Sequence, residues 1–178
     1  MASYDHAHTG VTEITWARFG ELCKELALAV TAYDPEIVVG IAKGGVLPAA
    51  VLASLLRREF YPIRLSRRHD DRVVRDQPAL LTPMPEAVAG KRVIVVDDIA
   101  VTGETLRLAA QEALRLGAAA VRTATLFVHR AGQRPDYFVL ETDDLILNPW
   151  DCLVLEGGRF VVHPEYQKEL DEIEKRAR

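Results

Sequence analysis

Cysteine is scarce in this sequence, which has only Cys23 and Cys152 among its 178 residues. Two thiols so far apart in the chain form neither a redox motif nor a metal-binding motif, and a reducing compartment is the simplest setting for them. The longest apolar stretch, residues 46–56, is too short to cross a bilayer. The first ten residues lack the basic and apolar regions of a signal peptide. We therefore expect a cytoplasmic protein that is not associated with a membrane.

The sequence also lacks an excess of positive charge. Lysine and arginine total 22 against 26 for aspartate and glutamate, which gives a net charge of −4. This balance does not favour nucleic acid as a partner. Two common nucleotide-binding motifs, G-x-x-x-x-G-K-[ST] and G-x-G-x-x-G after a strand, are absent. The length suits one domain, residues 1–178, with its own hydrophobic core.

What the chain does have is a distinctive stretch, residues 92–105, that reads RVIVVDDIAVTGET. Its apolar and mostly β-branched part, Val93–Val96, predicts a strand buried on both faces of a parallel sheet. That strand is expected to end at two carboxylates, Asp97 and Asp98. A small-residue turn follows, and residues 106–116 then predict a helix.

This order of elements predicts a binding site for a sugar phosphate. The start of a helix offers unpaired backbone N–H groups, to which Thr102 and Thr105 add hydroxyl donors, while Gly103 permits close approach to an anion. Asp97 and Asp98 would repel a phosphate unless they met sugar hydroxyls or a metal, so a vicinal diol and Mg²⁺ fit the site. The alternative is a plain strand-to-helix turn in which Thr102 is the N-cap and the aspartates are solvated.

A second loop of the same kind follows the strand predicted at Ile37–Ile41. It reads Ala42-Lys43-Gly44-Gly45 and leads into a helix predicted at residues 46–58. Adjacent glycines expose consecutive N–H groups, and a lysine supplies a positive charge, so this loop is a candidate anion site. The alternative is again an ordinary turn with a solvated lysine.

The remaining elements are expected from periodicity and from turn residues. They are a helix at residues 12–32, a strand at 60–65, a charged loop or hairpin at 66–72, an extended segment at 78–85, a strand at 121–128, a hairpin formed by residues 152–155 and 159–162 around Gly157-Gly158, and a surface helix or partly disordered tail at 164–178.

At residues 92–105 the chain resembles the type I phosphoribosyltransferases, whose signature is an apolar strand, two acidic residues and Thr-Gly-x-Thr. Residues 134–138 and 144–151, with Pro-Trp-Asp, extend this resemblance to the short prokaryotic hypoxanthine, guanine and xanthine phosphoribosyltransferases. The resemblance implies an α/β fold with a central, mostly parallel sheet flanked by helices and a small hood subdomain. It implies a core at about 12–128, a hood and C-terminal segment at about 129–163, and a surface tail at 164–178.

The resemblance also implies an activity. This is the Mg²⁺-dependent transfer of ribose 5-phosphate from phosphoribosyl pyrophosphate (PRPP) to a nucleobase, with a 6-oxopurine as the expected acceptor and pyrophosphate as the product. The implied partners are these small molecules and further copies of the chain, in a homodimer or tetramer. The implied catalytic residues are Asp97, Asp98 and Lys43. The residues implied to contact the 5′-phosphate are Ala100, Val101, Thr102, Gly103, Glu104 and Thr105, and those implied to contact pyrophosphate are Ala42, Lys43, Gly44, Gly45 and Arg67. The base is implied to contact Val101, His129, Leu145, Ile146 and Trp150. The implied ligands of Mg²⁺ are Asp97, Asp98 and Asp151.

Three of the base-contacting positions depart from the pattern of the purine enzymes. Val101 stands where an aspartate is usual, His129 where a lysine is usual, and Leu145 where an aromatic residue usually stacks on the base. The PRPP-contacting positions are kept. Two alternatives therefore remain open: a non-catalytic sensor of PRPP or of a nucleotide with the same fold, and an enzyme that transfers to a non-purine acceptor.

Overall fold

The computed structural model describes residues 8–66, 68–69, 72–73 and 79–177. Their contacts divide them into two compact units. The first comprises residues 22–142, and the second comprises residues 8–21 together with residues 143–177. The first unit holds both predicted anion loops, and it is the one that positions the candidate site.

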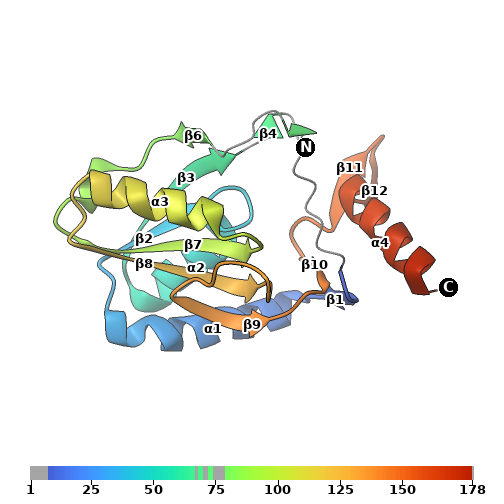
Figure 1. The fold of residues 1–178 in the computed structure, drawn as a ribbon, viewed down its shortest axis with the longest axis horizontal. Coiled ribbons are helices and arrows are strands. Elements are labelled where there is room, and N and C mark those ends of the chain that lie inside the picture. The colour runs from blue at the N-terminus through green and yellow to red at the C-terminus, as the bar shows by residue number, and fades with distance from the viewer. Residues whose placement is uncertain (1–7, 67, 70–71, 74–78, 178) are drawn as a thin grey trace. The chain divides into compact units, whose positions relative to one another are not determined.

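A six-stranded sheet forms the first unit, with the strand order β6-β3-β2-β7-β8-β9 (Figure 1). All neighbours pair in parallel except β3 and β6, which are antiparallel. The sheet is therefore mostly parallel, as the sequence predicts. The strands are β2 (Ile37–Ile41), β3 (Glu59–Ser66), β6 (Ala79–Thr82), β7 (Arg92–Ala100), β8 (Ala120–Val128) and β9 (Tyr137–Glu141).

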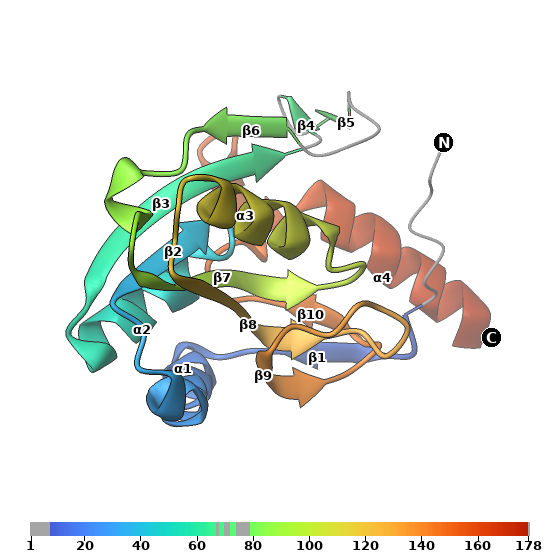
Figure 2. The same ribbon diagram turned by 60° about the vertical axis from the view of Figure 1, so that its left-hand side comes forward.

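Helices cover both faces of this sheet. Helix α3 (Glu104–Arg115) lies on one face, and α2 (Val46–Leu56) and α1 (Trp16–Val30) lie on the other (Figure 2). On the α3 side, Val93 and Val95 of β7 belong to one buried apolar cluster with Leu106 and Ala109. The central strands are buried on both faces, which explains their continuous runs of valine and isoleucine. Short elements complete the unit: the 3₁₀ helices η1 (Thr31–Tyr33) and η2 (Glu86–Val88), and the antiparallel pair β4 (Arg68–His69) and β5 (Arg72–Val73).

The second unit consists of two strand pairs and a helix. Strand β1 (Val11–Glu13) pairs in parallel with β10 (Leu145–Leu147), and β11 (Leu153–Glu156) forms an antiparallel hairpin with β12 (Arg159–Val162). The predicted hairpin is therefore confirmed. Its two turn glycines have φ values of 54° and 79°, which are readily adopted only by glycine. The tail forms the helix α4 (Pro164–Ala177).

Two element boundaries differ from the sequence prediction by four residues, and the other helix ends differ by at most two. The first helix begins at Trp16 and not at Thr12, because residues 11–13 pair with β10. The central strand does not end at Val96. It continues to Ala100, since β8 pairs with it along this whole length, and the two aspartates therefore lie inside β7.

Among the residues that the structure describes, none of the helices is both long and apolar enough to cross a membrane. The subdivision of one domain into a core, a hood and a surface tail stays a prediction.

Candidate active site

The two predicted anion loops lie at the same edge of the sheet. Strands β2 and β7 are parallel neighbours, with Gly40 opposite Val96, so the loops that follow them leave the sheet side by side. The contact between them is close. A Cβ on Gly45 would lie 2.6 Å from the Asp97 Cα, and a Cβ on Gly44 would overlap the Asp98 carboxylate. A side chain at residue 45 would collide with the backbone of residues 96 and 97, and one at residue 44 would displace the Asp98 carboxylate, so the first loop packs directly on the acidic pair.

The loop after β2 is held by backbone hydrogen bonds. The Ala42 N–H donates to the Ile63 carbonyl of β3 at 2.8 Å, and the Ala49 N–H donates to the Gly45 carbonyl at 3.1 Å. The peptide bond between Ala42 and Lys43 is cis. Lys43 itself is exposed. The loop thus brings a lysine and two glycines to the edge where Asp97 and Asp98 lie.

The two aspartates share a crowded and largely desolvated position. Burial raises the pKa of Asp97 well above its ordinary value, and the adjacent Asp98 charge raises it further. Burial also raises the pKa of Asp98, although hydrogen bonds from the Asp97 side chain and the Ile99 backbone oppose this effect. Both side chains keep some accessible surface. The pair therefore favours a ligand that supplies positive charge or hydroxyl donors to the carboxylates.

The second loop turns from β7 into α3 through Gly103, whose φ is 77°. Gly103 occupies the N-cap position, and the Gly103 carbonyl accepts from the Arg107 N–H at 3.0 Å. The alternative with Thr102 as the N-cap is therefore wrong, although the Thr102 hydroxyl accepts from the Glu104 N–H at 3.3 Å. Ala100 lies in the apolar core at the end of β7, and Thr105 lies in the first turn of α3.

The residues predicted to contact the base are divided between the two units. Val101 and the buried His129 belong to the first unit, and the His129 N–H donates to the Ala100 carbonyl at 2.9 Å. Leu145 and Ile146 are buried residues of β10 in the second unit. Their grouping around a base stays a prediction.

Trp150 packs among aromatic residues of the second unit. Its ring centroid lies 5.0 Å from that of Phe19 and 6.4 Å from that of Trp16. Asp151, the third predicted metal ligand, also lies in this unit and accepts from the Tyr166 hydroxyl at 3.0 Å. The remaining predicted site residue, Arg67, lies outside the described residues.

Sequence reasoning assigned His129, directly after β8, to the base site, but it did not identify Gly132 and Gln133 as supports of the phosphate loop. Gly132 lies so close to the Val101 carbonyl that a Cβ would overlap it, and the Gln133 N–H donates to the Thr102 carbonyl at 3.4 Å. The segment after β8 therefore packs against the backbone of the phosphate loop and forms a hydrogen bond with it. A glycine four residues after the strand end at Val128 was the only signal of this role in the sequence.

The donor set at this edge suits Mg²⁺ better than a metal that needs a complete cage of protein ligands. Within the described part of the chain, no group of three or more His, Cys, Asp or Glu side chains could hold a metal. Mg²⁺ commonly uses one or two carboxylates together with waters and substrate phosphates. The desolvated pair Asp97 and Asp98 offers such carboxylates.

Comparison with known proteins assigns the chain to a family. The model of the phosphoribosyl transferase domain matches residues 12–156, which include both loops and the acidic pair. This chain belongs to the phosphoribosyltransferase family. The predicted type I phosphoribosyltransferase fold is confirmed, as is the similarity to purine phosphoribosyltransferases.

Curated relatives match part of this chain. The bifunctional protein PyrR of Ralstonia nicotianae is 33% identical over 107 residues, which are 56% of this chain and 62% of the relative. The transcriptional regulator GfcR of Methanosarcina mazei is 31% identical over 105 residues, which are 59% of this chain and 50% of the relative. The chain thus spans less than two thirds of the length of either relative.

Solved structures match more of the chain. A purine phosphoribosyltransferase from Pyrococcus horikoshii is 28% identical with a TM-score of 0.72, and the match covers 83% of this chain and 99% of the other. The xanthine-guanine-hypoxanthine phosphoribosyltransferase of Helicobacter pylori is 21% identical with a TM-score of 0.68, and it covers 79% of this chain and 93% of its own. The second likeness is one of fold alone.

Proposed function

We propose that this protein is an Mg²⁺-dependent enzyme that transfers the 5-phosphoribosyl group of PRPP to a nucleobase, with a 6-oxopurine as the acceptor. The observation that carries the proposal is the packing of Gly44 and Gly45 against Asp98 and Asp97. It joins a candidate pyrophosphate loop to a pair of carboxylates beside a loop that enters a helix. The family match supports an enzyme of this class.

In the proposed reaction a nitrogen of the base forms a bond to C1 of the ribose, the bond from C1 to the pyrophosphate oxygen breaks, and its electron pair leaves with pyrophosphate. The base gives up its ring N–H proton, which passes to water or to the departing pyrophosphate because Val101 cannot accept it. Bound Mg²⁺ would neutralise charge on the pyrophosphate. Asp97 and Asp98 would hold the metal and orient the ribose hydroxyls, while Lys43 and the Gly44 N–H would stabilise the leaving group. Such a reaction needs positioning and electrostatic stabilisation more than it needs a protein nucleophile.

The 5′-phosphate would bind where β7 turns into α3. There the backbone N–H groups of residues 102–105 and the hydroxyls of Thr102 and Thr105 would donate to it, with the help of the positive end of the helix dipole. Gly103, at φ 77°, gives the loop the turn that this arrangement requires. These contacts fix the sugar, so that C1 can be presented to the base in one orientation.

A purine as the acceptor is supported by the match to the purine phosphoribosyltransferase of Pyrococcus horikoshii over 83% of this chain. The narrower choice of a 6-oxopurine rests on the resemblance at residues 134–138 and 144–151. Val101 indicates that the base site differs from that of the purine enzymes which the chain resembles, because valine cannot act as a general acid or base. A general acid or base contributes roughly 10²–10⁴-fold to such a step, so its loss slows transfer without forbidding it.

Release of pyrophosphate tests the proposal directly. PRPP and Mg²⁺ are mixed with hypoxanthine, guanine, xanthine, adenine, uracil or orotate, with the double variant Asp97→Asn/Asp98→Asn as the control. The expected result is turnover with one 6-oxopurine that disappears in the control. Turnover with uracil or orotate alone would instead establish a non-purine acceptor.

A second candidate function is a non-catalytic sensor of PRPP or of a nucleotide. Two observations favour it: three base-contacting positions depart from the purine pattern, and matched relatives include the regulator GfcR and the bifunctional protein PyrR. Calorimetry with PRPP and Mg²⁺ separates the two candidates. Tight binding with no turnover on any base would support the sensor.

The setting and assembly of the protein also belong to the proposal. We propose a cytoplasmic enzyme without a nucleic-acid partner, which agrees with its few cysteines and its net charge of −4. The homodimer or tetramer rests on the family resemblance alone. Sedimentation velocity at micromolar concentration would test the assembly, with a single monomeric species as the contrary result.

A further inference from the structure

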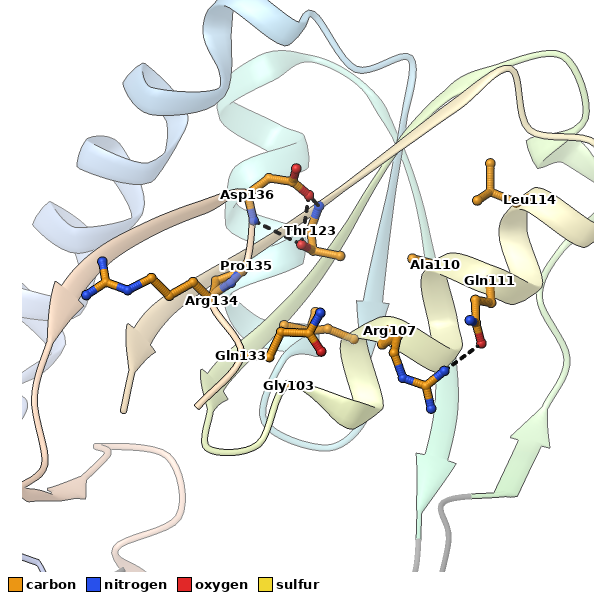
Figure 3. A pocket seen from close by; sticks show the side chains of 11 residues that line it. Gly103, Arg107, Ala110, Gln111, Leu114, Thr123, Gln133, Arg134, Pro135 and Asp136 are labelled. Atoms are coloured by element: carbon orange, nitrogen blue, oxygen red, sulfur yellow. Dashed lines mark hydrogen bonds between the residues drawn. The ribbon is translucent and has the colours of Figure 1, made fainter. Parts of the chain in front are cut away.

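A groove of about 380 Å³ lies on the α3 side of the first unit, away from the acidic pair. One wall is the exposed face of α3, and the other is the segment of residues 133–136 that leads into β9 (Figure 3). Neither Asp97, Asp98 nor the loop of residues 42–45 lines it. The groove is therefore separate from the positions proposed for the ribose and the pyrophosphate, although Gly103 of the proposed 5′-phosphate loop is among the residues that line it. Its volume lies within the range of roughly 300–1,000 Å³ that is usual for small-molecule sites.

The wall of the groove formed by α3 carries a positively charged side chain, an amide side chain and an apolar side chain along one face of the helix. Arg107, Gln111 and Leu114 are spaced i, i+4 and i+7, so they share one face of α3. The Arg107 guanidinium donates to Gln111 Oε1 at 2.9 Å, and among the described residues it has no carboxylate partner. Leu114 is 53% exposed. An arginine with only a neutral neighbour is suited to bind a phosphate.

The opposite wall is rigid and carries little free negative charge. The Asp136 carboxylate accepts from the Thr123 N–H at 2.8 Å and from the Thr123 hydroxyl at 2.9 Å, and it is also paired with Arg122 at 3.1 Å. Arg134, which lines the groove, is paired with Glu141. Gln133 is exposed and adds a second side-chain amide. Two amides, each with a donor and an acceptor, match the hydrogen-bonding edge of a nucleobase.

The groove is mechanically connected to the phosphate loop. Gln133 lines the groove, and its N–H donates to the Thr102 carbonyl at 3.4 Å. Its own carbonyl lies 2.8 Å from the position of a Cβ on Gly103. A ligand that displaces the backbone of Gln133 would therefore also displace the loop proposed to hold the 5′-phosphate.

We propose that this groove binds a nucleoside 5′-phosphate as a regulatory ligand, with its phosphate on Arg107 and its base against Gln111, Gln133 and Leu114. Binding there changes the affinity of the neighbouring loop for PRPP through Gln133 and Gly103. The binding itself does not depend on the catalytic assignment, whereas its effect on PRPP rests on the proposed function.

Calorimetry with defined probes tests the proposal. AMP, GMP and UMP are titrated separately into the full chain, with and without saturating PRPP and Mg²⁺. The test variant is Arg107→Gln, and the matched control is Arg115→Gln, which removes the same charge from an exposed arginine of the same helix that is paired with Glu112 outside the groove. Both variants keep all the residues proposed to contact PRPP.

We expect at least one nucleotide to bind in the presence of saturating PRPP, to bind about tenfold or more weakly to the Arg107→Gln variant, and to bind normally to the Arg115→Gln variant. Equal binding to both variants, or complete displacement of every nucleotide by PRPP, would overturn the proposal. If PRPP does not bind at all, the proposed function fails, and the comparison of the two variants still decides whether the groove is a nucleotide site.

Discussion

Gly45 lies directly against Asp97, with 2.7 Å between the position of a Cβ on the glycine and Oδ1 of the aspartate. This contact connects the loop after β2 to the acidic pair of β7, and it leaves no room for any side chain at residue 45. The candidate site therefore depends on a glycine as strictly as it depends on the carboxylates.

The change Gly45→Ala tests this dependence. We expect a loss of about 1–3 kcal/mol in the free energy of unfolding, because the added methyl group must displace the backbone of residue 97. PRPP binding should be lost together with that stability. Urea unfolding and calorimetry measure the two effects.

The matched control is Gly20→Ala. No atom lies within 4 Å of a Cβ at this helical position, so the same change should stabilise the protein by roughly 0.5–1 kcal/mol and leave PRPP binding intact. If the two variants were equally stable, close packing at Gly45 would not be important.

Position 101 permits a test of the missing acid. The change Val101→Asp places a carboxyl group where the purine enzymes that this chain resembles have one, whereas Val101→Asn adds a side chain of the same shape without an ionisable group. We expect the aspartate variant to turn over a 6-oxopurine roughly 10²-fold faster than the asparagine variant, as general acid or base catalysis would provide. Steady-state release of pyrophosphate measures this ratio, and a ratio near one would show that residue 101 does not act on the base.

The hydrogen bonds of the Glu36 carboxylate predict a contribution to the free energy of unfolding that depends on pH. Its carboxylate accepts from the Arg92 N–H at 3.0 Å and from Lys91 Nζ at 3.1 Å, and these hydrogen bonds lower its pKa from the ordinary value of 4.5. A carboxylate with a lowered pKa stabilises the folded state above its unfolded pKa, and that stability is lost as the pH falls through the folded pKa.

The variant Glu36→Gln should therefore be less stable than the parent protein at pH 7, and this difference should shrink below about pH 4.5. Thermal unfolding between pH 3 and 7 measures it. Glu59→Gln, at an exposed glutamate of β3, serves as the control. A difference that stayed constant down to pH 3 would mean that the ionised carboxylate is not the stabilising group.

The two cysteines should react at very different rates. Cys23 has no exposed surface, and burial raises its pKa to about 12, whereas Cys152 is partly exposed. Because the thiolate is the reactive form, a thiol reagent at pH 8 should label Cys152 quickly and Cys23 only when the protein opens. Absorbance with a disulfide reagent resolves the two phases. The variant Cys152→Ser should retain only the slow phase, and rapid labelling of this variant would contradict the burial of Cys23.

Local sequence signals predicted the parts of the fold that depend on neighbouring residues. The valine run before Asp97 gave the central strand, and Gly157-Gly158 gave the hairpin, because burial and positive φ values each restrict the residues that can occupy such positions. The acidic pair and the glycine loops could also be predicted, because each is a short run of neighbouring residues whose types are unusual at the end of a buried strand.

Features that depend on distant partners were not visible in the sequence. Residues 11–13 form a strand only because β10 lies beside them, and a strand of three residues is too short to show periodicity. The extension of β7 beyond Asp97 depends on its pairing with β8, and the support of Gly103 by Gln133 is a tertiary contact. None of these partners is close in the sequence.

The parallel pairing of β1 with β10 also determines which part of the chain can fold first during synthesis on the ribosome. Residues 11–13 emerge early, whereas residues 145–147 emerge only after the whole first unit. Residues 11–13 therefore have no partner strand during the synthesis of the sheet that carries the candidate site. Joining segments so far apart also costs more loop-closure entropy than joining neighbours. Assembly of the second unit is thus the later event, and a nascent chain stopped before residue 145 cannot form the β1–β10 pair.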